Sequence, residues 1–320
     1  MKHLPIISLI ALLLAACARS PEYRTAAGST WGTTYHITYN AERDLSDSII
    51  EQMRLIDMSL SPFVDSSLLS RINRGEDSIP DALISEVFCL SQRVCSISGG
   101  AFDPTLAPLI NLWGFGYKNG TGDPTDAQID SAMALVGIMD CAIDSLGALR
   151  KKSPGTAFNF SAIAKGYGVD KIAEMLRRNG CIDYMVEVGG EVALSGTNSH
   201  GEDWHIQVDA PMEDKGEVQH NRLMVIPITD LCMATSGNYR NYRETSKGKA
   251  GHTISAVTGR PITTGIISAT IIAPSCAYAD ALATATMAMP DSSAQLMLRS
   301  LPDIQAILVL SDSTVVEINR

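Results

Sequence analysis

The order of the helical and strand patterns is the feature that most limits the fold of this chain. Apolar residues recur at helical spacing through the first half, and the clearest stripe lies at Ile49, Ile50, Met53, Ile56 and Leu60. Short alternating or β-branched runs, separated by Gly, Asn and Pro, fill the second half. Helices and strands that come in runs favour an α+β fold over a doubly wound sheet. Because the 320 residues contain no repeat or clear linker, we expect mixed sheets with packed helices in one globule or two interlocked lobes.

Capping and turn signals give approximate bounds to these elements. The predicted helices are 47–60, 66–73, 81–97, 104–111, 125–136, 162–178 and 277–289. The predicted strands are 33–39, 157–160, 184–188, 191–195, 204–209, 223–227, 268–273 and 304–310, followed by a C-terminal hairpin segment.

The N-terminus has the pattern of an export signal. Lys2 precedes an apolar run over residues 4–16 that is too short to span a bilayer as a stable helix. The run ends in two alanines directly before Cys17, which resembles a bacterial lipobox. We therefore predict a signal peptide over residues 1–16, a lipidated Cys17 that begins a tether over 17–27, and one folded domain over 28–320. A plain secretory signal with an incidental cysteine is the alternative.

The charge balance limits the ligands that the chain can hold. It has 25 lysines and arginines against 35 acidic residues, so its formal net charge is -10. This balance argues against a non-specific nucleic-acid binder. A phosphate site on such a chain would need a set of metal ligands or an isolated Lys or Arg.

A carboxylate and a hydroxyl stand out on the apolar C-terminal helix. Asp280 and Thr284 are four residues apart, so their oxygens lie on one helix face among Ala, Leu and Met. A hard cation such as Mg²⁺ would satisfy both oxygens. The alternative is that Asp280 complements the helix dipole and that Thr284 bonds back to its own helix.

Three further segments suit a nucleotide. Lys165 lies in the first turn of a predicted helix, where free amides and the dipole favour a phosphate, although a solvated surface lysine is the alternative. Gly99 and Gly100 precede Phe102, which with Trp113 and Phe115 could form the wall for a flat ring; a helix C-cap and core aromatics are the alternative. The segments 235–240 and 252–254 add basic and titratable groups near turns.

Taken in order, these segments resemble the ApbE family of flavin transferases, the FAD:protein FMN transferases. The motifs that carry the resemblance are WGTTY (31–35), FVDSS (63–67), SRIN (70–73), GGAFDP (99–104), AIAKGY (162–167), EVGGE (187–191), ATSGNYR (234–240), HTI (252–254) with TG (258–259), and APSC (273–276) with ADA (279–281). Together they cover nearly the whole chain after the signal.

The resemblance implies a lipid-anchored, periplasm-facing enzyme of the bacterial cell envelope, on the inner membrane rather than the outer. It would split the pyrophosphate of FAD and place FMN on a threonine hydroxyl of a partner, such as a subunit of a redox-driven membrane complex. It implies Mg²⁺ ligands at Asp280, Thr284 and the backbone carbonyl of Ala162. It implies contacts to FAD, as substrate, from Trp31, Phe63, Ala101, Phe102, Asp103, Asn159, Lys165 and Ile254.

Two positions depart from the family pattern. The family usually has Asp where this chain has Asn159, which keeps the hydrogen-bonding capacity but loses a charge. It has Asp-Pro where this chain has Ser255 and Ala256, a change expected to relax a turn beside the site.

The expected chemistry is phosphoryl transfer, which depends on positioning and charge neutralisation. We expect Mg²⁺, held by Asp280, Thr284 and Ala162, to act on the pyrophosphate so that AMP leaves as a stabilised anion, with Lys165 assisting. His252 is the only histidine within a motif and is the candidate for taking the proton of the acceptor hydroxyl; a turn-stabilising histidine is the alternative. Two other functions remain open: a Mg²⁺-dependent FAD pyrophosphatase giving FMN and AMP, and a non-catalytic FAD-binding lipoprotein.

Overall fold

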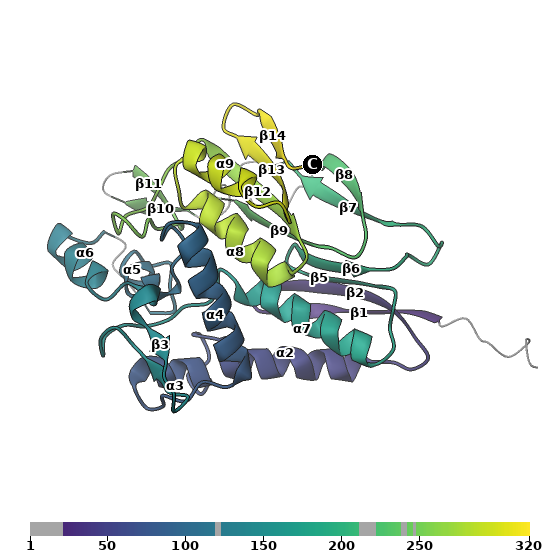
Figure 1. The fold of residues 1–320 in the computed structure, drawn as a ribbon, viewed down its shortest axis with the longest axis horizontal. Helices are drawn as coiled ribbons and strands as arrows, with labels where there is room; N and C mark the ends of the chain where they lie inside the picture. Colours follow the sequence, from purple (N-terminus) through teal and green to yellow (C-terminus); the bar gives the residue numbers. More distant parts are fainter. Residues whose placement is uncertain (1–21, 119–122, 211–221, 238–241, 246–247) are drawn as a thin grey trace, which may run out of the picture.

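An eight-stranded antiparallel sheet forms the centre of the fold (Figure 1). The computed structural model describes residues 22–118, 123–210, 222–237, 242–245 and 248–320. In spatial order, the strands of the sheet are β1 (Glu22–Thr30), β2 (Thr33–Ala41), β5 (Tyr184–Val188), β6 (Glu191–Ser195), β9 (Cys232–Gly237), β12 (Ile266–Ala273), β13 (Gln305–Leu310) and β14 (Val315–Ile318). Separate two-stranded hairpins are β3 (Ala142–Ile143) with β4 (Leu149–Arg150), β7 (Trp204–Asp209) with β8 (Arg222–Ile228), and β10 (Tyr242–Thr245) with β11 (Gly248–Gly251).

Helices, two of which pack directly against one face of this sheet, make up much of the rest of the fold. They are α2 (Ser46–Leu60), α3 (Leu68–Arg74), α4 (Ala82–Ile97), α5 (Ala107–Leu112), α6 (Asp126–Met133), α7 (Ala164–Arg178), α8 (Cys276–Met287) and α9 (Asp291–Arg299), with 3-10 turns η2 (Pro104–Leu106) and η3 (Ile138–Asp140). The helices α7 and α8 lie side by side, directly against β5, β6, β9 and β12. The β7–β8 hairpin covers the other face through an apolar cluster that includes Trp204, Ile226 and Ile272. The sheet is therefore buried on both sides over its central strands.

The predicted α+β class is confirmed, and the helical stripes of the sequence become helices within a few residues of their predicted ends. The strands predicted at 33–39, 184–188, 191–195, 204–209, 223–227, 268–273 and 304–310 also form. The elements that the sequence patterns missed are β1, η3, the β3–β4 hairpin, β9, the β10–β11 hairpin and α9.

The strand predicted at 157–160 is wrong. Phe158 and Phe160 are fully buried, which explains the strand-like pattern of the sequence. The backbone of Phe158 pairs with a side chain instead of a neighbouring strand: its amide donates to Asn73 Oδ1 at 2.7 Å, and its carbonyl accepts from Asn73 Nδ2 at 2.8 Å. The backbone of Phe158 is thus hydrogen-bonded without belonging to a sheet.

The predicted tether is too long. Residues 22–27 belong to β1, which pairs with β2 from Glu22 opposite Ala41 to Thr30 opposite Thr33. The two residues between these strands, Trp31 and Gly32, have φ values of 50° and 75°, as a tight two-residue hairpin requires. Only residues 17–21 of the predicted tether precede the folded domain.

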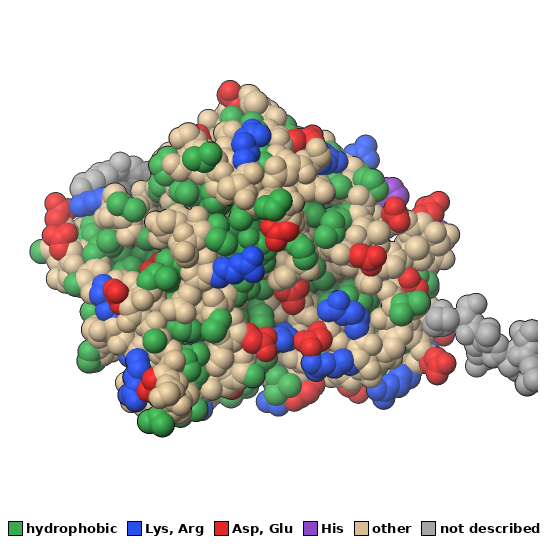
Figure 2. Space-filling view, viewed as in Figure 1, with side chains coloured by type: hydrophobic (Ala, Val, Ile, Leu, Met, Phe, Trp, Pro, Cys, Tyr) green, Lys and Arg blue, Asp and Glu red, His purple; other side chains and the backbone are tan. Residues whose placement is uncertain are grey.

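The predicted signal peptide and Cys17 lie outside the described residues. No helix in the described part of the chain is long and apolar enough to cross a membrane. Acidic and basic side chains are interspersed over the face shown in Figure 2.

Candidate active site

Two adjoining cavities lie where the start of α7 meets α8 and the loops beside the sheet. The first has a volume of about 460 Å³, the second about 510 Å³, and Phe63, Ser161 and Lys165 line both. Trp31 lines the second cavity. The other predicted site residues line the first: Phe63, Ala101, Phe102, Asp103, Asn159, Ala162, Lys165, His252, Ile254, Asp280 and Thr284. The structure therefore brings together residues spread over most of the chain.

Asp280 lies at the contact between α7 and α8. Its side chain is buried, and Oδ2 accepts a hydrogen bond from the amide of Gly166 at 3.0 Å. Gly166 allows this approach because a Cβ there would lie 2.4 Å from the Cys276 carbonyl oxygen and 2.8 Å from Asp280 Cβ. Burial raises the pKa of the Asp280 carboxyl, and the nearby Lys165 ammonium acts against that rise.

Neither Asp280 nor Thr284 has the purely structural role that the sequence left open as an alternative, namely a carboxylate at the helix dipole and a threonine bonded back to its own helix. The start of α8 is capped by Ser275, whose side chain accepts from the amide of Tyr278, and Asp280 lies beyond the first turn, where the helix dipole has little effect. Thr284 faces the cavity, and its Oγ1 lies 3.4 Å from Ser236 Oγ at the end of β9. The threonine that bonds back to its own helix is Thr286, which donates to the Leu282 carbonyl at 2.8 Å.

The chain enters α7 through a turn that borders the first cavity. Asn159 Oδ1 accepts from the amide of Ser161 at 2.9 Å, a role that needs an acceptor and no charge. The Gly166 amide, which lies in the first turn of α7 and has no acceptor within the helix, donates to Asp280 Oδ2. Ala162 lies just before the start of α7 and lines the first cavity.

Lys165 is not a solvated surface lysine. Its Nζ lies 2.7 Å from Oε1 of Glu191, and about a third of its side chain (35%) is exposed where it borders both cavities. Burial works against the charge of Lys165, but Glu191 and Asp280 outweigh this effect, so the pKa of the ammonium is raised. Burial raises the pKa of the Glu191 carboxyl, which is only 2% exposed, and Lys165 counteracts part of that rise.

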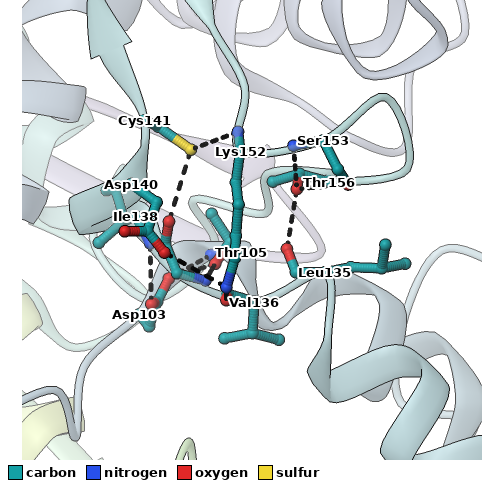
Figure 3. Close-up of polar contacts among 11 residues, drawn as sticks. Asp103, Thr105, Leu135, Val136, Ile138, Asp140, Cys141, Lys152, Ser153 and Thr156 are labelled. Atoms are coloured by element: carbon teal, nitrogen blue, oxygen red, sulfur yellow. Dashed lines mark hydrogen bonds and ion pairs between the residues drawn. The ribbon is translucent and has the colours of Figure 1, made fainter.

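The loop after α4 forms the opposite wall, as Figure 3 shows in part. The Asp103 carboxylate is held by protein donors: Oδ1 accepts from the Thr105 amide at 2.8 Å and its hydroxyl at 2.6 Å, and Oδ2 accepts from the Ile138 amide at 3.0 Å. Asp103 therefore ties the wall to η3. Of the three aromatic residues, Phe102 and Phe115 line the cavity, whereas Trp113 packs behind it and donates to the Gly259 carbonyl at 2.8 Å.

His252 closes the remaining side. Its ring meets Phe115 edge-on, with the ring centroids 6.5 Å apart. The turn that follows is not relaxed by the departure at Ser255: Ser255 Oγ accepts from the amides of Val257 and Thr258 at 3.2 and 3.3 Å. The serine hydroxyl thus holds this turn in place.

Comparison with known proteins agrees with this geometry. The model of the ApbE family matches residues 31–308. The chain belongs to the ApbE family. An FAD:protein FMN transferase of Vibrio cholerae is 37% identical over 288 residues, which cover 87% of this chain and 85% of that protein, and one of Salmonella typhimurium is 32% identical over 308 residues, covering 90% and 87%.

Solved structures of ApbE proteins share the fold. The flavin transferase ApbE from Vibrio cholerae superposes with a TM-score of 0.80 at 32% identity, over 93% of this chain and 96% of that one. The apo form of the Pseudomonas stutzeri flavinyl transferase ApbE gives 0.82 at 27% identity, over 94% and 96%. The family and the transferase class predicted from the sequence are confirmed.

The sequence motifs contained two further residues that line the first cavity, but sequence reasoning assigned them no role. Glu191 stands in the EVGGE motif, but its partner Lys165 is 26 positions away, and no local pattern links the two. Ser236 lies at the end of β9, a strand that the patterns did not reveal. An acid directly after a Gly-Gly turn, at the first position of a buried strand, is a signal that could have identified Glu191.

Proposed function

We propose that this chain transfers FMN from FAD to a threonine hydroxyl of a target protein, with release of AMP and with Mg²⁺ as the required cation. The relatives named as FAD:protein FMN transferases support the flavin transfer. The observation that supports the Mg²⁺ dependence and the reaction at the pyrophosphate is that Asp280, Thr284 and Ala162 all line the cavity that Lys165 borders.

The residues present fit a magnesium ion. A carboxylate, a hydroxyl and a backbone carbonyl are all hard oxygen ligands, which Mg²⁺ prefers. Ala162 lies before the start of α7 and lines the first cavity, so its carbonyl can serve as one of these oxygens without interrupting the helix. A bound Mg²⁺ would supply positive charge to the pyrophosphate and to the leaving AMP.

The protein residues have separate tasks in the transfer. Lys165 holds the pyrophosphate through its ammonium group, and Phe102 and Phe115 shield the reacting centre from water. The acceptor hydroxyl attacks the phosphorus of the FMN moiety, so that a new phosphoester bond forms as the phosphoanhydride bond to AMP breaks. The hydroxyl proton passes to His252, which borders the same cavity.

The decisive experiment follows both products. Wild-type protein and Asp280→Ala are incubated with FAD, Mg²⁺ and a threonine-bearing acceptor; AMP is measured by chromatography and flavin on the acceptor by mass spectrometry. We expect Asp280→Ala to abolish transfer while its circular dichroism spectrum stays unchanged. Full activity in excess EDTA would overturn the proposed metal dependence.

The same incubation separates the alternatives. FMN and AMP released without any acceptor would indicate a pyrophosphatase. FAD bound without release of AMP under any condition would indicate a non-catalytic flavin-binding protein.

For location, we propose a lipid anchor at Cys17 that holds the enzyme at the periplasmic side of the inner membrane, where a subunit of a redox complex is the acceptor. The lipobox-like end of the apolar run supports this. Cys17→Ala should move the protein from the membrane fraction to the soluble fraction of cells and remove incorporation of labelled palmitate. Membrane retention of the variant would contradict the anchor.

A further inference from the structure

We propose that Glu191 is a positioning residue for Lys165: it fixes the lysine ammonium at the border of the two cavities, where the pyrophosphate of FAD binds. The proposal rests on the proposed function of the site. The contact that carries it is the 2.7 Å pair between Glu191 Oε1 and Lys165 Nζ, with Glu191 almost fully buried and Lys165 open to both cavities.

Both partners are anchored through their backbones. Glu191 is the first residue of β6 and pairs with Val188 across the Gly189-Gly190 turn, whose φ values of 63° and 99° require glycine. Lys165 lies in the first turn of α7, directly before the close contact with α8. A lysine side chain has four flexible methylenes, so a fixed carboxylate beside its ammonium restricts it to one direction.

The burial of this acid is not explained by stability alone. A buried ion pair contributes little net stability, because desolvation offsets the attraction between the charges. Glu191 also has a buried Oε2 that receives no hydrogen bond from another residue in the described part of the chain, which is a further cost to folding. An apolar residue at the start of β6 would avoid both costs, so we assign the carboxylate to the site.

A double-mutant cycle tests this assignment. The wild type, Glu191→Gln, Lys165→Met and the double variant are compared by the rate of FMN transfer to an acceptor protein and by FAD affinity from flavin fluorescence. We expect Glu191→Gln to lower kcat by about 10- to 100-fold, as a misplaced positioning group does. In the Lys165→Met background the same change should have no further effect on kcat or on FAD affinity.

The EVGGE motif provides the matched control. Glu187 lies on the same hairpin but is outside both cavities, and its Oε1 accepts from the Gly190 amide at 2.8 Å. Glu187→Gln should transfer FMN at the wild-type rate. If thermal melting shows that the Glu191→Gln protein is not folded, Glu191→Asp takes its place in the cycle. Aspartate keeps the negative charge, but its side chain is one methylene shorter, so its carboxylate lies farther from Lys165.

The outcomes separate the inference from the proposed function. The positioning role would be wrong if the kcat losses of Glu191→Gln and Lys165→Met multiplied in the double variant. It would also be wrong if Glu191→Gln had the wild-type kcat. A wild-type protein that binds FAD but transfers no FMN would overturn the proposed function. In that case the FAD affinities of the four proteins in the double-mutant cycle would still test whether Glu191 acts through Lys165.

Discussion

Replacement of Gly166 by alanine tests whether the contact between α7 and α8 sets the geometry of the site. The added Cβ would lie 2.4 Å from the Cys276 carbonyl oxygen, 2.7 Å from its carbon and 2.8 Å from Asp280 Cβ. Because two of these atoms are backbone, the helices must separate by about 1 Å to restore ordinary contact. Overpacking of this kind costs up to about 3 kcal/mol, and the higher helix propensity of alanine returns about 1 kcal/mol.

The net loss of about 2 kcal/mol should lower the Tm by about 3 °C in a domain of this size, because the entropy of unfolding grows with chain length. Activity should fall further, by about 100-fold, because the shift displaces Lys165 relative to Asp280. Gly155→Ala is the control, since its Cβ would meet only the Leu135 side chain, at 3.0 Å, and we expect near wild-type behaviour. Calorimetry and FMN transfer rates check both variants; a Gly166→Ala protein with unchanged Tm and rate would refute the reasoning.

Three further predictions concern single side chains. Thr284→Val should raise the Mg²⁺ concentration needed for half-maximal transfer by about tenfold or more, whereas Thr286→Val should leave it unchanged; a magnesium titration distinguishes them. Asp170→Ala removes the acceptor of two amides and one hydroxyl at the start of α8, and should lower the free energy of unfolding by about 2–4 kcal/mol in urea titrations. Hydrogen bonds, chiefly from Ser46, lower the pKa of Asp44 to about 2, so its contribution to stability should be complete above about pH 4 and lost as the pH falls toward 2. The Tm difference between wild type and Asp44→Asn should shrink over that range, and a constant difference would contradict the assignment.

The sequence predicted those elements whose side chains have one clearly buried face. The stripe of α2 and the alternation of β2 are of this kind, and both elements form near their predicted bounds. The edge strand β1 has no such alternation, because most of its side chains are exposed or only half-buried on both faces. The strand prediction at 157–160 was wrong for the opposite reason. Phe158 and Phe160 are buried like the side chains of a strand, but the Asn73 side chain makes the hydrogen bonds that a neighbouring strand would make.

The candidate site shows the same limit. Asp280 and Thr284 could be found because polar side chains at helical spacing are conspicuous on an apolar helix. The role of Asp103 could not be found, since the partners that hold its carboxylate include Ile138, 35 positions later in the chain. The sequence motif thus located Asp103, but only the structure shows that both of its carboxylate oxygens already accept hydrogen bonds from protein donors.

The charges around the first cavity explain how an acidic chain can hold an anionic substrate. Among the described residues that line it, three acids, Asp103, Glu191 and Asp280, face one lysine. Amide and hydroxyl donors satisfy Asp103, while Glu191 and Asp280 share the charge of Lys165. With both of these carboxyls ionised, one positive charge is lacking before a pyrophosphate enters. Under the proposed function, Mg²⁺ held beside Asp280 would supply this charge, and its ligands and Lys165 would act together on the pyrophosphate.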